Sequence, residues 1–140
     1  MSNTHIVNLA SYVKPTIKED KRRDWVAYGE GQWDNDYYSY LIYLYVNSTT
    51  NRAIIEGISN MIFGRGLDAL DSSSKPDEYA AMRSIFHDIC LRKISLDLKM
   101  LGEASFQILY KDGKVVRAEH FPRQTLRAER MNDDGKIEAY

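Results

Sequence analysis

Residues 101–122 read LGEASFQILYKDGKVVRAEHFP, and the hydrophobic period changes within them. Ahead of Gly102 the apolar residues recur at the three-four spacing of a helix, whereas every second residue from 104 to 110 is apolar, as in a strand. The sequence KDGK at 111–114 is typical of a tight turn between two antiparallel strands. This stretch therefore predicts an α+β protein with a β-hairpin at about residues 103–121.

Three segments ahead of the hairpin predict three helices, at about residues 36–47, 51–63 and 76–101. The third has a strong start, because Ser74 is a suitable N-cap and Pro76 falls in the first turn. In the second, isoleucine and methionine residues follow one buried stripe. Gly57 lies inside this second helix. Because glycine in a helix interior costs about 1 kcal/mol relative to alanine, we expect close backbone packing there.

The predicted helix at 36–47 is apolar on nearly every face, which is typical of a helix buried on several sides. One interpretation is a well-covered core helix. The other is that some tyrosines face a neighbouring chain, since tyrosine combines an apolar ring with a polar tip. The candidate subunit-interface residues are Tyr37, Tyr38, Tyr40, Tyr43 and Tyr45.

Residues 124–140 predict a second hairpin, with 124–131 as its first strand and NDDG at 132–135 as its turn. The sequence stops within the second strand of this hairpin. We therefore expect the chain to be part of a longer protein, truncated at the C-terminus.

Residues 1–24 predict a flexible, locally basic arm. Between positions 14 and 23 five basic residues accompany two acidic ones, and Pro15 breaks any helix. A solvated, mobile terminus is the simpler interpretation. The alternative is a contact with phosphate, for which the candidates are Lys18, Lys21, Arg22 and Arg23. An extended stretch at 25–28 then opens the folded domain, 25–140.

The composition limits the classes of protein to which the chain can belong. Its length of 140 residues fits one domain, and a net charge of −1 provides no overall field toward nucleic acid or anionic lipid. Cys90 is the single cysteine, which excludes an intramolecular disulfide and fits a reducing compartment. The sequence has neither a secretory signal nor an apolar run of the roughly 20 residues that a membrane span needs.

The motifs that could carry chemistry are weak. GRGLDA at 64–69 has the letters of a dinucleotide-binding motif, but it closes a predicted helix instead of opening one. His87 and Cys90 lie one helical turn apart, and two ligands do not make a zinc site. We therefore expect no catalytic, cofactor-binding or metal-binding residue, and the chain is predicted not to be an enzyme.

Three passages resemble the N-terminal part of the portal proteins of tailed bacteriophages and prophages. The first is VAYGE at 26–30 followed by YYSYLIYLYVNS at 37–48. The second is NRAIIEGISNMIFGRG at 51–66, and the third is DLKMLGEASFQILY at 97–110 with the turn and strand that follow. Each passage is a loose pattern of apolar residues and glycines. Their order and spacing across 25–140 carry the resemblance.

The resemblance implies a structural subunit of the portal ring, the head-tail connector through which DNA is packaged and ejected. The chain would then be part of the outer wing, in an incomplete α+β domain, because portal subunits are several times longer. Its partners would be other portal subunits in a homo-oligomeric ring. Capsid, terminase, neck proteins and double-stranded DNA would meet parts absent here. The location would be the virion, and the host cytoplasm during assembly, with neither membrane nor cofactor involved.

Two other functions stay open on the sequence alone. One is a small α+β ligand-binding or enzymatic domain whose site cannot be identified from the sequence. The other is a nucleic-acid-binding module that uses the basic arm.

Overall fold

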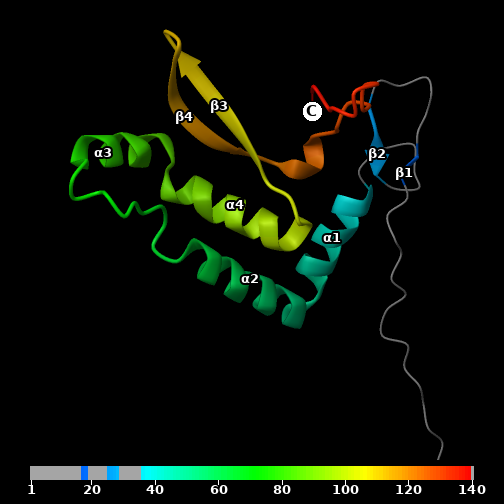
Figure 1. Cartoon of the computed structure of the whole chain (residues 1–140). Coiled ribbons are helices and arrows are strands. Elements are labelled where there is room, and N and C mark those ends of the chain that lie inside the picture. The colour runs from blue at the N-terminus through cyan, green and yellow to red at the C-terminus, as the bar shows by residue number, and fades with distance from the viewer. Residues whose placement is uncertain (1–16, 19–24, 29–35, 140) are drawn as a thin grey trace, which may run out of the picture.

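The computed structural model of the chain describes residues 17–18, 25–28 and 36–139 (Figure 1). These residues form four α-helices and two antiparallel strand pairs, which confirms the predicted α+β class. In chain order the elements are β1 (Ile17–Lys18), β2 (Ala27–Tyr28), α1 (Asp36–Asn47), α2 (Thr49–Phe63), α3 (Pro76–Ile85), α4 (Asp88–Leu101), β3 (Ser105–Lys111), β4 (Lys114–Phe121) and the 3-10 turn η1 (Arg123–Thr125).

Helix α4 lies between α2 and the β-hairpin formed by β3 and β4 (Figure 1). The side chains of Ile55, Ser59 and Phe63 are buried on the side of α2 that packs along α4. Helix α1 contacts both α2 and α4 near the C-terminal end of α4. The fold is therefore a set of thin layers with α4 in the middle.

Helix α2 begins two residues earlier than predicted, because the Ser48 hydroxyl accepts a hydrogen bond from the Asn51 backbone N–H at 3.3 Å. The helix ends at Gly64, where the sequence predicted its end, with a backbone bond from Gly64 to the Asn60 carbonyl at 3.0 Å. The expectation of close packing at Gly57 is wrong. A Cβ atom at Gly57 would have no neighbour within 4 Å.

The predicted helix at 76–101 is divided into α3 and α4 at Phe86 and His87. Phe86 has φ −108° and ψ 89° and forms a parallel bridge with Ala118 of β4. Its ring meets that of Phe106 edge-on, with the centroids 5.7 Å apart. Contacts with the hairpin thus override the local helical pattern, which continues through both residues.

The start of α3 differs in detail from the prediction. The Ser74 hydroxyl donates to the Asp71 carbonyl, and Lys75 occupies the N-cap position without a side-chain bond. Pro76 stands in the first turn as predicted. Helix α4 ends at Gly102, also as predicted, with φ +79° and a bond from its N–H to the Leu98 carbonyl at 3.2 Å.

The predicted hairpin at 103–121 is confirmed as β3 and β4. Asp112 and Gly113 both have positive φ at its turn, which is the geometry that closes two-residue hairpins. An irregularity between Leu109 and Tyr110 shifts the register near the tip. The pairing of Ile108 with Ala118 places one face of the hairpin toward the helices.

The predicted second hairpin at 124–140 forms no named strand within the described residues. Its first residues adopt the turn η1, and the chain then pairs with the N-terminal segment, since the Val26 N–H donates to the Ala128 carbonyl at 2.8 Å. Glu129 bridges Trp25 and also donates its N–H to the Ala139 carbonyl. The expected turn at 132–135 is present. Residues 128 and 129 thus use backbone groups on opposite edges, one toward the N-terminal segment and one toward residue 139, and the pairing across the turn is limited to isolated hydrogen bonds among the described residues.

The predicted arm lies mostly outside the described residues. Two of its members, Ile17 and Lys18, pair with β2 in antiparallel register. The other candidates for phosphate contact, Lys21, Arg22 and Arg23, lie outside the described residues.

The core is small for the amount of apolar sequence. Seven apolar residues are buried among the described residues, while eighteen large ones are exposed. None of the described helices is long and apolar enough to cross a bilayer. The excess of exposed apolar side chains is the feature that a function must explain.

Two glycines provide a matched test of the helix geometry. Gly57→Ala should raise the free energy of unfolding by about 0.5–1 kcal/mol, because alanine favours a helix interior and no atom lies within 4 Å to oppose a methyl group. Gly102→Ala should lower it by about 1 kcal/mol, since an L-residue is strained at positive φ. Urea unfolding measures both changes. Effects of the same sign would contradict the helix positions described here.

Candidate functional site

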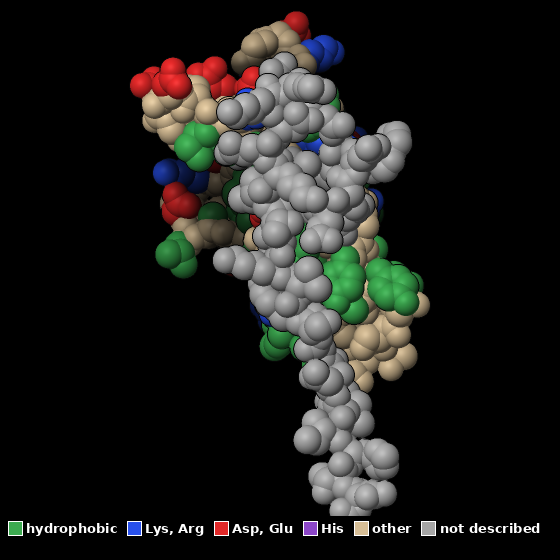
Figure 2. All heavy atoms as spheres, turned by 90° about the vertical axis from the view of Figure 1, so that its right-hand side faces the viewer, with side chains coloured by type: hydrophobic (Ala, Val, Ile, Leu, Met, Phe, Trp, Pro, Cys, Tyr) green, Lys and Arg blue, Asp and Glu red, His purple; other side chains and the backbone are tan. Residues whose placement is uncertain are grey.

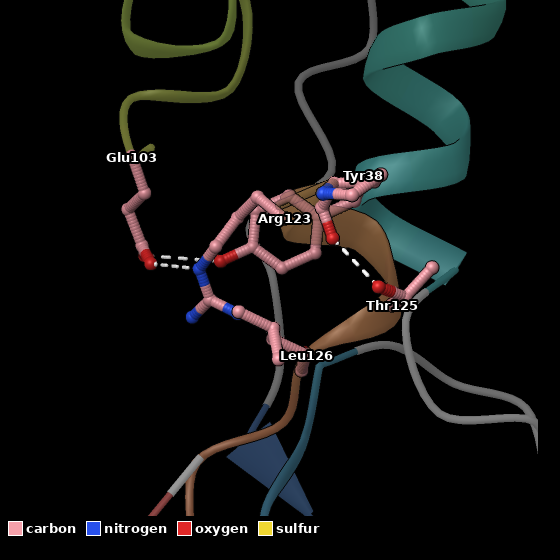
Figure 3. Close-up of polar contacts among 6 residues, drawn as sticks. Tyr38, Glu103, Arg123, Thr125 and Leu126 are labelled. Carbon is pink, nitrogen blue, oxygen red and sulfur yellow. Dashed lines mark hydrogen bonds and ion pairs between the residues drawn. The ribbon is translucent and has the colours of Figure 1, made fainter. Parts of the chain in front are cut away.

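Arg123 is a charged residue in the protein interior, with 3% of its surface exposed (Figure 3). Its Nε donates to Glu103 Oε2 at 2.6 Å, and its Nη1 donates to the Leu126 carbonyl at 3.0 Å. The guanidinium carbon lies 5.2 Å from the centroid of the Tyr38 ring. The Tyr38 hydroxyl in turn donates to Glu103 Oε1 at 3.0 Å. Tyr38, Glu103 and Arg123 thus form one connected group, the Arg123 cluster.

The Arg123 cluster joins three parts of the chain. Tyr38 belongs to α1, Glu103 lies between α4 and β3, and Arg123 follows β4. A buried guanidinium costs several kcal/mol unless it is paired. The Glu103 side chain remains 48% exposed, so its carboxylate stays in contact with water while it neutralises Arg123. Because its positive charge is already neutralised, the cluster is suited to holding elements together and not to binding an anion.

A second buried polar pair joins α4 to β4. His120 Nε2 and Asp97 Oδ2 lie 2.7 Å apart, and both side chains are largely buried. A buried carboxylate requires a partner, and the hairpin supplies it. This pair therefore fixes the base of the β-hairpin on the central helix.

An open cleft of about 540 Å³ lies between the start of α4 and β4, lined in part by His87, Cys90 and His120. His87 is exposed and Cys90 is buried. Burial raises the pKa of the Cys90 thiol above its ordinary value, although a hydrogen bond with the His120 backbone opposes the rise. A thiol that stays protonated is a poor nucleophile and a poor metal ligand. Among the described residues, no group of three or more His, Cys, Asp or Glu could hold a metal ion.

The five candidate tyrosines of α1 lie in different environments. Tyr38 is 2% exposed and belongs to the interior of this chain, so it must be removed from the candidate interface. Tyr37 is half-buried beside it, with the ring centroids 6.1 Å apart. Tyr45 is also half-buried, and its hydroxyl donates to a carboxylate of α2. Tyr40 and Tyr43 are 45% and 61% exposed, and these two can present their rings to a neighbour.

The carboxylate that Tyr45 contacts belongs to Glu56. Glu56 Oε1 accepts from the Tyr45 hydroxyl at 2.7 Å and from Arg52 Nε at 2.8 Å. The Arg52 hydrogen bond, with that of Tyr45, lowers the pKa of Glu56 below its ordinary value, and burial raises the pKa of Tyr45. Arg52 and Glu56 thus neutralise each other at the junction of α1 and α2.

Residues 37–64, which form most of α1 and all of α2, contain only these two charged residues, whereas 28% of the whole chain is charged. Large apolar side chains are exposed along both helices. We call this set the α1–α2 surface: Tyr40, Tyr43, Val46, Ile54, Met61 and Ile62. In Figure 2, one group of hydrophobic side chains is exposed at the right, below mid-height, and most Asp and Glu side chains lie at the top and upper left. Depletion of charge together with exposed aromatic residues is typical of the centre of a protein interface.

No protein-family model, curated protein or solved structure matches the chain. The similarity to portal proteins therefore stays an expectation from the sequence. Function must be inferred from that similarity together with the geometry of the described residues.

Sequence reasoning missed both buried polar groups. Glu103 and Arg123 are 20 residues apart, and Asp97 and His120 are 23 apart, so neither pair has a local pattern. The available signal was the position of Asp97 between Leu96 and Leu98 in the last turns of a helix.

We expect removal of the two charges of the Arg123 cluster to lower the free energy of unfolding by unequal amounts. Glu103→Ala should lower the free energy of unfolding by about 3 kcal/mol, because it removes the carboxylate that accepts a charge-assisted hydrogen bond from a buried guanidinium. Arg123→Met should cost only about 1–2 kcal/mol, since the half-exposed Glu103 can be hydrated. Urea unfolding at pH 7 measures the two variants and their combination. The double variant should be no less stable than Glu103→Ala, and a milder effect of Glu103→Ala than of Arg123→Met would refute this electrostatic account.

The environment of Cys90 predicts slow alkylation and a pH-dependent contribution to stability. Because burial raises the pKa of the thiol, iodoacetamide at neutral pH should react severalfold more slowly with the folded chain than with the chain in urea. The protonated thiol favours the folded state below its ordinary pKa of about 8.5, and this contribution is lost as pH rises through the higher folded-state value. The difference in unfolding free energy between wild type and Cys90→Ala should therefore narrow as the pH rises from the ordinary pKa of the thiol to its higher folded-state pKa. A constant difference would show that the thiol titrates alike in both states.

Proposed function

We propose that the chain is a structural subunit of a homo-oligomeric ring, part of the outer wing of a bacteriophage portal protein. The observation that carries the proposal is the α1–α2 surface. Its residues are apolar, are exposed in the single chain and lie in a stretch with two mutually paired charges. A surface of this kind is stable in water when another protein surface covers it.

The order of the sequence passages supports the choice of a portal protein among ring-forming proteins. The passages at 26–30 with 37–48, at 51–66 and at 97–122 correspond to β2 with α1, to α2, and to the end of α4 with the β-hairpin. In the proposed assembly, double-stranded DNA passes through the ring. Capsid, terminase and neck proteins meet parts of the subunit beyond this chain, and the assembly acts in the virion after forming in the host cytoplasm.

The proposal assigns no chemical reaction to the chain. The buried polar groups support this choice, because Arg123 is neutralised by Glu103 and Asp97 is paired with His120. Both pairs join structural elements and leave the cleft beside Cys90 without an activated nucleophile. The role proposed is one of packing between subunits.

Self-association of the 140-residue chain tests the proposal. Sedimentation velocity should show oligomers whose size stops increasing with concentration, and electron microscopy should show closed rings. The variant Tyr40→Gln with Tyr43→Gln should require about tenfold more protein to assemble, equivalent to about 1.4 kcal/mol. Its free energy of unfolding should change by less than about 0.5 kcal/mol, because both residues are exposed.

Leu70→Gln provides a matched control, because Leu70 is fully exposed outside the α1–α2 surface. This variant should assemble like the wild type. A chain that remains monomeric at millimolar concentration, or a tyrosine variant that assembles like the control, would count against the proposed subunit interface.

A further inference from the structure

We propose that the α1–α2 surface of one subunit is covered by the β-hairpin of a second copy, so that subunits associate head to tail. This inference rests on the proposed ring and specifies which surfaces meet in it. A closed cyclic ring of more than two subunits requires a heterologous contact, in which two different patches of the same chain meet. The chain must therefore carry a second apolar surface in another place.

The β-hairpin carries that second surface. Twelve of the eighteen exposed large apolar residues fall in two regions, six on α1 and α2 and six on β3 and β4. The other six are distributed among the remaining described segments. The six of the hairpin are Phe106, Ile108, Leu109, Tyr110, Val115 and Val116.

Only the base of the hairpin's apolar face is covered within the chain. Alternation along β3 places Phe106, Ile108 and Tyr110 on the same face, and their partners on β4 are His120, Ala118 and Val115. At the base, Ala118 is 1% exposed and His120 pairs with Asp97. Toward the tip, Tyr110 is 68% exposed. The distal half of this face is therefore available to another molecule.

The two surfaces belong to elements that lie on different sides of the central helix. The hairpin and α2 flank α4 (Figure 1). Ile54 and Met61 project from the face of α2 opposite the stripe that contains Ser59 and packs on α4. Two different patches on separate elements suit repetition of the same contact from subunit to subunit, whereas a two-fold dimer would use one patch twice.

The charges of the two surfaces are compatible with direct contact. The α1–α2 surface offers only the pair Arg52 and Glu56, which neutralise each other at 2.8 Å. On β4, Arg117 and Glu119 pair at 2.8 Å and project from the face opposite Ala118.

Lys111 and Lys114 lie opposite each other beside the turn, and by alternation they project from the face opposite Tyr110 and Val115. Contact through the face of Tyr110 and Val115 therefore leaves these lysines outside the apolar contact, which favours apolar burial.

Two double variants, mixed together, test the head-to-tail contact in the full chain. The helical variant carries Tyr43→Gln and Met61→Gln, which keep helix propensity. The hairpin variant carries Tyr110→Thr and Val115→Thr, which keep strand propensity. Each variant retains one intact surface. Alone, each should remain monomeric at concentrations at which the wild type assembles, and an equal mixture should form a one-to-one heterodimer and nothing larger, measured by native mass spectrometry and sedimentation velocity.

The other outcomes overturn the inference in distinguishable ways. A hairpin variant that still dimerises alone would indicate a two-fold contact between α1–α2 surfaces, and a helical variant that does so would indicate pairing of two hairpins. A wild type that assembles while the mixture stays monomeric would refute the pairing and leave the ring intact. A monomeric wild type would refute both. Urea unfolding of each variant, expected within about 0.5 kcal/mol of the wild type, verifies that the substitutions act on association.

Discussion

Burial of the Arg123 guanidinium is the constraint on which the arrangement of the elements depends. A charge in the interior of so small a core is tolerated only with a counter-charge and further hydrogen bonds. Glu103 supplies the charge, the Leu126 carbonyl accepts a second bond, and the Tyr38 ring covers the guanidinium. Because these partners come from the start of the hairpin, from η1 and from α1, satisfying one side chain fixes the position of three elements.

The remaining elements form single layers on either side of α4, which leaves many apolar side chains exposed. Helix α4 has α2 on one side and the hairpin on the other, so each outer layer is covered on one face only. An exposed apolar residue gains little burial within the chain, yet α1, α2 and the hairpin carry twelve large apolar residues that are exposed. Association between copies would recover that burial. The proposed head-to-tail contact would account for an excess on two separate surfaces.

The polar groups described above have structural roles, because each joins two or more elements of the fold. Asp97 and His120 anchor the hairpin, and Arg52, Glu56 and Tyr45 join α1 to α2. The cleft beside Cys90 contains residue types used in catalysis, but burial raises the pKa of the thiol, which works against formation of a nucleophilic thiolate. Paired charges and a thiol of raised pKa are consistent with the proposed subunit, whose role is contact with other subunits.

The sequence alone determined the α+β class and the bounds of α1, the ends of two helices at Gly64 and Gly102, and the turn of the β-hairpin. Each of these depends on hydrophobic periodicity, on glycine at positive φ or on turn residues, and these signals act over a few neighbouring positions. Tertiary structure decided the division of α3 from α4, where Phe86 pairs with Ala118. It also decided that residues 128 and 129 pair with the N-terminal segment as well as across their own turn, so that no regular second hairpin forms among the described residues. It also separated buried Tyr38 from exposed Tyr43 on one helix of almost uniform composition. These outcomes depend on partners 20 or more residues away, and the helical or strand period of a segment contains no information on which distant segment will meet it.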